Sequence, residues 1–131
     1  MVSREKIEGY ILKLSLTYRE AGKSSWIIQD SEKGIEDLVV ILADPLVILR
    51  INVMPAPAGG TGREKLFEEL LRLNATDMVH GAYALDGKTI VIVDTLEADT
   101  LDIEEFQASI DAIGLALAQH YRVLSPYRAA T

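Results

Sequence analysis

The residues of this chain that could carry chemistry are few, and no group of them has the spacing of a catalytic or metal-binding site. His80 and His120 are the only histidines, and neither stands in a pattern for a general base or a pair of ligands. Cysteine is absent, which excludes a thiolate nucleophile, a disulfide and a cysteine zinc site. A serine nucleophile elbow is also missing. We therefore predict a protein that is not an enzyme, with no catalytic residue, cofactor or metal, although an active site assembled from distant residues stays open.

Two segments have a composition that could bind ions. Residues 59–63, GGTGR, precede a predicted helix, where free backbone N–H groups favour an anion. They lack the Lys-Ser/Thr pair of a P-loop, so we interpret them as a flexible loop before a capped helix, and anion binding by Gly59 to Gly62 stays open. A run of acids lacks the spacing and the glycine of an EF-hand, and first-turn acids are explained by the helix dipole. These acids are Asp94, Glu97, Asp99, Asp102, Glu104 and Glu105.

The composition is that of a globular domain with an acidic surface. The 131 residues are 49% hydrophobic and 25% charged, which suffices for a single domain over residues 1–131. The formal net charge of -7 would repel a phosphate backbone, so nucleic acid is not an expected partner. The N-terminus lacks the apolar segment of a secretory signal, and no apolar run reaches the ~18 residues that span a bilayer. We expect a cytoplasmic protein that does not bind a membrane.

The spacing of apolar residues predicts helices at the start and in the middle of the chain. The first helix runs from Ser3 to about Ala21, with Ser3 as its N-cap and Gly22 as its end. Its core stripe is Ile7, Ile11, Leu14 and Tyr18, and Leu12 and Leu16 lie on the opposite side. A capping box at Thr61–Glu64 opens the second helix. The apolar residues of that helix cover an arc of roughly 160°, wider than the ~100° of one core contact; they are Leu66, Phe67, Leu70, Leu71 and Leu73.

Strand patterns fill the rest of the chain up to a last helix. Three antiparallel strands are expected at Ser25–Gln29, Glu36–Ala43 and Leu46–Met54. A hairpin follows, with strands from Met78 to Leu85 and from Thr89 to Thr95 around an Asp86-Gly87 turn. Asp102 and Glu105 form a capping box for the last helix. The predicted class is α+β, a five-stranded twisted antiparallel sheet with helices packed mainly on one face, in the order α-β-β-β-α-β-β-α. The expected core is Ile7, Ile11, Leu14, Phe106, Ile110, Ile113 and Leu117.

Four segments carry a resemblance to a known family: LLRLN at residues 70–74, GAYALDG at 81–87, TL at 95–96 and LDIEE at 101–105. With the order of elements, they make the chain similar to the class I type III secretion chaperones, of the Tir-chaperone kind, and to the related YbjN-like bacterial proteins. The resemblance implies a non-enzymatic fold with a twisted antiparallel sheet and two long helices on one face, usually dimeric. Chaperone members of the family hold an effector segment in extended form along apolar patches.

Apolar residues outside the main stripes suggest surfaces for a partner, because exposed apolar patches usually mark interfaces. We predict a homodimer that is a chaperone-like protein-binding module and holds a polypeptide segment on apolar surface. The alternative is a YbjN-like regulatory or adaptor protein that binds a folded partner. Burial of the same residues in the monomer core also stays open. The predicted client contacts are Leu12, Leu16, Trp26 and Ile28. The predicted dimer contacts are Leu66, Phe67, Leu70, Leu71, Gly81 and Tyr83.

Overall fold

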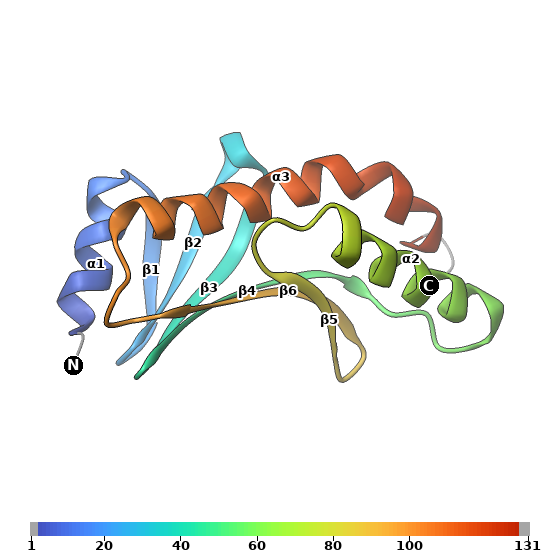
Figure 1. Ribbon diagram of the computed structural model, residues 1–131, viewed down its shortest axis with the longest axis horizontal. Coiled ribbons are helices and arrows are strands. Elements are labelled where there is room, and N and C mark those ends of the chain that lie inside the picture. Colours follow the sequence, from blue (N-terminus) through green and yellow to red (C-terminus); the bar gives the residue numbers. More distant parts are fainter. Residues whose placement is uncertain (1–2, 129–131) are drawn as a thin grey trace.

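A computed structural model describes residues 3–128 of the chain (Figure 1). Three α-helices, six strands and a short 3-10 helix follow one another within these residues. In chain order they are α1 (Arg4–Lys13), β1 (Thr17–Gly22), β2 (Ser25–Asp30), η1 (Ser31–Lys33), β3 (Ile35–Ala43), β4 (Leu46–Pro55), α2 (Gly60–Thr76), β5 (Ala82–Asp86), β6 (Thr89–Glu97) and α3 (Ile103–Arg128). None of these helices is long and apolar enough to cross a membrane.

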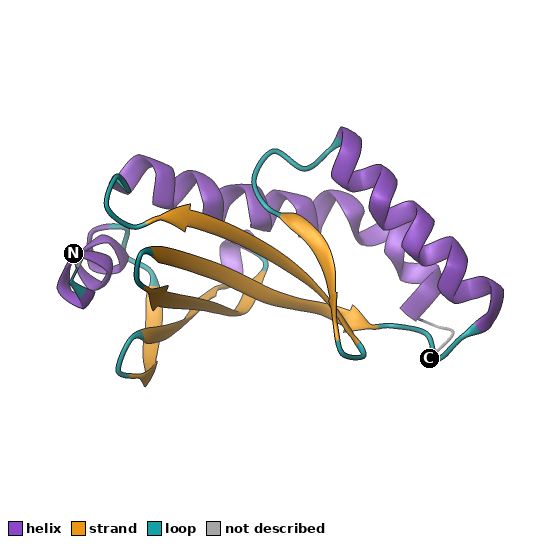
Figure 2. Cartoon of the chain, turned by 60° about the horizontal axis from the view of Figure 1, so that its bottom comes forward, coloured by secondary structure: helices purple, strands orange, loops and turns teal. Residues whose placement is uncertain are grey.

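The strands form one antiparallel sheet in the order β1-β2-β3-β4-β6-β5. The long helix α3 runs across one face of the sheet, with α1 beside the β1–β2 end and α2 beside the β5 end (Figure 1). Figure 2 shows how strongly the sheet curves around the helices. The predicted α+β class is confirmed, but the sheet has six strands where five were predicted.

The additional strand is β1, which occupies residues that the sequence assigned to the first helix. The helix ends at Lys13, and Ser15 turns the chain with a φ of 57°. Leu16 N–H then bonds to the Ile11 carbonyl at 3.2 Å, which closes the last turn of the helix. Tyr18 had the spacing of a helical core residue, yet it lies opposite Ile28 in the sheet. A non-glycine residue with positive φ leaves no strong signal in the sequence, so the predicted helix continued through it.

The core lies between the helices and one face of the sheet. Alternate residues of β4 point into it, namely Val47, Leu49 and Ile51, as a strand with one covered face requires. Five of the seven predicted core residues are buried, while Leu14 and Leu117 are partly buried against the others. The buried members of this predicted set are Ile7, Ile11, Phe106, Ile110 and Ile113, and α2 adds the fully buried Leu66.

The starts of the two long helices differ in their capping. Asp102 and Glu105 form the predicted capping box: the Glu105 N–H donates to the Asp102 carboxylate at 2.8 Å, and the Asp102 N–H donates to the Glu105 carboxylate at 3.3 Å. The capping box predicted at Thr61 is wrong. The helix α2 begins at Gly60 after Gly59, without a side-chain cap, so Thr61 already lies in the first turn. The Arg63 guanidinium holds the preceding loop by donating to the Pro57 carbonyl at 2.8 Å.

Candidate protein-binding surfaces

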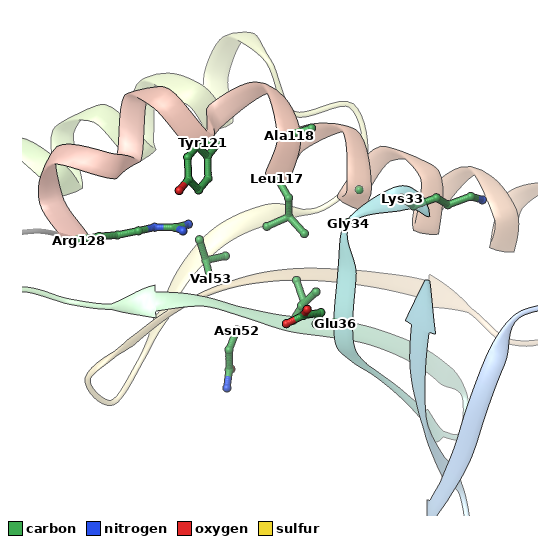
Figure 3. Close-up of a pocket in the computed structure, with 11 residues that line it drawn as sticks. Lys33, Gly34, Glu36, Asn52, Val53, Leu117, Ala118, Tyr121 and Arg128 are labelled. Atoms are coloured by element: carbon green, nitrogen blue, oxygen red, sulfur yellow. The ribbon is translucent and has the colours of Figure 1, made fainter. Parts of the chain in front are cut away.

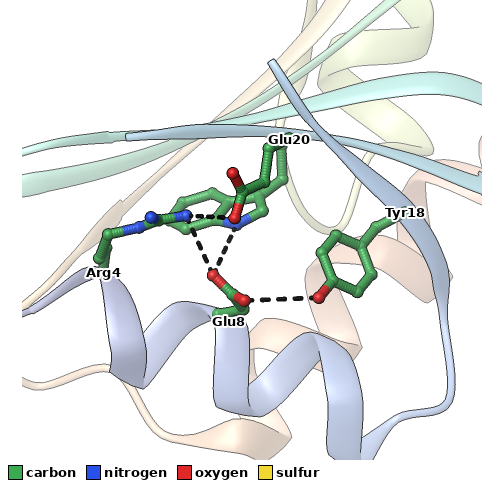
Figure 4. Close-up of polar contacts among 5 residues, drawn as sticks. Arg4, Glu8, Tyr18 and Glu20 are labelled. Atoms are coloured by element: carbon green, nitrogen blue, oxygen red, sulfur yellow. Dashed lines mark hydrogen bonds and ion pairs between the residues drawn. The ribbon is translucent and has the colours of Figure 1, made fainter. Parts of the chain in front are cut away.

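A polar cluster joins α1 to the two first strands (Figure 4). Arg4 bonds to Glu8 on the next turn of α1 at 3.0 Å and to Glu20 on β1 at 2.9 Å. Glu8 also accepts hydrogen bonds from the Tyr18 hydroxyl and the Trp26 indole, both at 3.4 Å. Burial, with the negative charge of Glu8, raises the pKa of Tyr18. The cluster therefore fixes α1 over β1 and β2 and keeps the phenol protonated.

The predicted client contacts divide into two groups in the folded chain. Leu12 on α1 is 59% exposed, and Leu16 just before β1 is partly buried. Trp26, whose indole bonds to Glu8 of α1, and Ile28 are both fully buried, so neither presents surface to a partner in this conformation. Their strand β2 is not at the edge of the sheet, and its alternate residues face the helices. The sequence pattern identified the apolar strand but could not show which layer covers it.

The edge of the sheet beside this surface is open. The strand β1 pairs with β2 on one side, and it forms the end of the sheet on the other. Within residues 3–128, no side chain bonds to a backbone group of β1. An edge strand presents unpaired N–H and C=O groups, to which another extended chain can add. The helix α1 and the edge strand β1 lie together at one end of the molecule (Figure 1). Leu12 belongs to α1, and Leu16 directly precedes β1.

The other end of the molecule carries an apolar groove between α2 and β5. It has a volume of about 220 Å³ and is lined by Phe67, Leu70, Leu71, Asn74, Tyr83, Ala84, Leu85 and Ile90. The side chains of Leu71 and Leu85 are 69% and 43% exposed, so leucines protrude beside the hollow. Four of the six predicted dimer contacts line this groove. The remaining two serve the monomer: Leu66 is fully buried, and Gly81 packs on β6.

Gly81 allows the chain to enter β5 close to the neighbouring strand. Its φ is 78°, and a Cβ at this position would lie 2.8 Å from the carbonyl oxygen of Val93. A residue with a side chain would therefore be strained and would clash with the backbone of β6. The glycine has a structural role in the monomer whether or not a second copy binds near it.

The side chain of Asn74 bonds to both backbone groups, the N–H and the C=O, of a single residue of β5. The Tyr83 N–H donates to the Asn74 side-chain oxygen at 2.8 Å, and the Asn74 side-chain NH₂ donates to the Tyr83 carbonyl at 3.2 Å. Asn74 lies in the last turn of α2, nine residues before its partner. Sequence reasoning assigned it no role, because a polar residue at the end of an apolar arc reads as the boundary of the helix.

His120 is buried and lies at the centre of a chain of hydrogen bonds. Its Nδ1 is 2.6 Å from the Tyr83 hydroxyl, and its Nε2 is 3.1 Å from the Asp77 carboxylate. A carboxylate accepts, so Nε2 carries the proton and Nδ1 accepts from the phenol. The bond from Thr76, together with that from His120, lowers the pKa of Asp77. Burial raises the pKa of Tyr83 to about 12. The chain ties β5 to α3 and to the end of α2.

A larger cavity, of about 520 Å³, lies between α3 and the strands β3 and β4 (Figure 3). Ile51, Val53 and Leu117 supply apolar walls. Lys33 and Arg128 lie on opposite sides of the cavity, and the Arg128 guanidinium is 5.2 Å from the centroid of the Tyr121 ring. The polar groups do not converge on one point as those of an active site do. Within residues 3–128, no cluster of three or more acids and histidines could hold a metal ion.

Comparison with known proteins places the chain in a family. Residues 2–130 match the family model CesT_Tir_1, so the chain belongs to that family. No curated protein matches the sequence at a significant level. The resemblance that the sequence motifs predicted, to type III secretion chaperones and YbjN-like proteins, is confirmed at the level of the superfamily.

Solved structures share the fold at low sequence identity. A chain of the heterodimeric ExoU–SpcU complex from the type III secretion system of Pseudomonas aeruginosa has a TM-score of 0.70 and 15% identity, over 95% of this chain and 99% of that chain. YbjN, a putative transcription regulator from E. coli, has a TM-score of 0.67 and 13% identity, over 93% and 96%. A chain of the HopA1–SchA chaperone–effector complex has a TM-score of 0.65 and 7% identity, over 88% and 90%.

Proposed function

We propose that this protein is a non-enzymatic, cytoplasmic binding module of a single domain, which acts as a homodimer and holds an extended segment of another polypeptide. The observation that carries the proposal is the open edge of β1 beside the exposed Leu12 and the partly buried Leu16. A segment could add to that edge as a strand and place apolar side chains against the leucines. Trp26 is buried and contributes indirectly, because its indole bonds to Glu8 and so joins β2 to α1. Ile28 is buried in the core and contributes only through the stability of β2.

The family and the fold support a protein partner. One of the similar structures is a complex from a type III secretion system, and another is a chaperone–effector complex. The formal charge of -7 disfavours nucleic acid, and no metal cluster is found among residues 3–128. An apolar surface next to a free strand edge recognises an extended chain better than it recognises a small polar substrate.

The α2–β5 groove supports a second copy as the dimer partner. In a two-fold dimer the same patch contacts itself, so it must hold both a hollow and the group that fills the hollow. The groove meets this condition, because Leu71 and Leu85 protrude beside a hollow lined by Phe67, Leu70 and Tyr83. We propose that Leu71 of each copy enters the groove of the other.

A second candidate function is a regulatory or adaptor protein that binds a folded partner. The similarity to YbjN favours it, since that protein is described as a putative transcription regulator. The two candidates share the fold and differ in the state of the partner. An extended, protease-sensitive polypeptide indicates the chaperone, whereas a partner that is folded on its own indicates the adaptor.

Photo-crosslinking at two equally exposed leucines tests the proposed surface. A photoreactive amino acid replaces Leu12 in one variant and Leu115 of α3 in the control; these side chains are 59% and 57% exposed. In cells of the native host, we expect position 12 to crosslink one polypeptide, which mass spectrometry identifies, and position 115 not to. Equal crosslinking at both positions, or none at position 12 while a partner still co-purifies, would reject this surface.

A further inference from the structure

The two edge strands of the sheet, β1 and β5, differ in whether a side chain bonds to their outward backbone groups. At β1 the outward backbone groups have no side-chain partner among residues 3–128. At β5, Tyr83 is bonded on both its N–H and its C=O by Asn74. Tyr83 lies opposite Ile92 of β6, and in an antiparallel pair alternate residues direct their backbone groups toward the partner strand or away from it. The groups of Tyr83 that bond to Asn74 are therefore those on the free side of the edge.

Asn74 thus takes the place that a neighbouring strand would take. An amide side chain offers one acceptor and two donors, the same groups that a paired residue presents. The strand β5 has five residues, Ala82–Asp86, and by alternation only Tyr83 and Leu85 direct backbone groups outward. Asn74 closes one of these two positions, which leaves too few free groups for a continuous ladder with another strand.

We infer that Asn74 closes the β5 edge of the sheet and directs a second copy of this chain to the α2–β5 groove, where it docks through side chains and not by continuing the sheet. This rests on the proposed function, in which the groove is the dimer contact. The asymmetry leaves β1 as the edge at which an extended polypeptide can add. A sheet with two open edges would extend from copy to copy, and one closed edge prevents that.

Removal of the side chain opens the edge without changing the core. We would replace Asn74 by Ala, with Asn52→Ala as the matched control, because Asn52 is the other asparagine and lies exposed on β4. Hydrogen exchange measured by NMR follows the Tyr83 amide, with the Ala82 and Ala84 amides, which face β6, as internal references. Light scattering on the same samples gives the distribution of masses.

In Asn74→Ala we expect exchange at Tyr83 to be faster by on the order of tenfold, as loss of one hydrogen bond allows, while Ala82 and Ala84 change little. We also expect species larger than those of the parent, which grow with concentration, and parental behaviour in Asn52→Ala. Unchanged exchange at Tyr83, or faster exchange without any larger species, would overturn the inference.

The same data separate this inference from the dimer itself. A parent protein that stays at 14.4 kDa contradicts the dimer proposal, yet new association of Asn74→Ala from that monomer still supports the closed edge. A parent dimer whose mass and Tyr83 exchange are untouched by Asn74→Ala supports the dimer and rejects the role of Asn74.

Discussion

The replacement of Gly81 by Ala tests whether this residue serves the monomer, and the structure supplies a matched control. Both Gly81 and Gly87 have positive φ, 78° and 60°. Alanine at either position incurs the strain of a left-handed backbone, roughly 1–2 kcal/mol. At Gly87 nothing lies within 4 Å of the added Cβ, whereas at Gly81 the Cβ would lie 2.8 Å from the Val93 carbonyl oxygen.

The clash adds a second cost at Gly81 alone. A contact under 3.0 Å with a backbone atom forces β5 and β6 apart, and overpacking of this kind costs about 1–3 kcal/mol. We therefore expect Gly81→Ala to lower the free energy of unfolding by ~2–5 kcal/mol and Gly87→Ala by only ~1–2 kcal/mol.

Urea unfolding followed by circular dichroism measures both variants, at a protein concentration fixed across the samples so that association does not alter the comparison. If Gly81→Ala is no less stable than Gly87→Ala, the close approach of Gly81 to the backbone of β6 is refuted. If it were equally stable and also lost the dimer in light scattering, Gly81 would belong to the interface after all, as the sequence predicted.

Further predictions concern the core, a helix cap and the response to pH. Phe106→Ala should cost ~3–5 kcal/mol, because the ring is fully buried; a loss below ~1 kcal/mol would contradict its place in the core. Asp102→Ala should cost about 1 kcal/mol through the lost cap of α3, read from the shift in urea midpoint. Burial raises the pKa of Tyr83 from 10.0 to about 12. The stability that the protonated Tyr83 contributes to the fold is therefore present below pH 10 and is lost as the pH rises to about 12. In Tyr83→Phe the free energy of unfolding should fall less over this pH range. An unchanged fall would mean that other titrating groups cause it.

The sequence predicted much of the fold because several of its signals are local. The hairpin signal at Asp86-Gly87, the alternation in β4 and the β-branched run of β6 each rest on neighbouring residues. The hairpin forms with Asp86 paired to Thr89 and the turn at Gly87-Lys88, but β5 begins at Ala82, four residues after the predicted start at Met78. The capping box of Asp102 and Glu105 is equally local and is confirmed. The predicted first helix was too long. The four-residue spacing of Leu14 and Tyr18 fits one face of a helix, but it also fits one face of an extended chain, and nothing before Ser15 signals a turn.

The candidate surfaces were harder to predict, because they depend on contacts between distant segments. Trp26 looked available on a short strand, but α1 covers it from 18 residues away along the chain. Asn74 and Tyr83 meet only when α2 lies along β5. His120 did leave a signal, since it continues the buried stripe of α3 from Ile113 to Leu124, where a polar residue needs a buried partner.

Hydrogen exchange of the protein with and without its co-purified polypeptide tests the central claim most directly. If an extended segment adds at the open edge, amides of β1 become protected in the complex, while the Tyr83 amide, already bonded to Asn74, changes little. Protection confined to α3 or to the cavity beneath it, with β1 unchanged, would contradict the account.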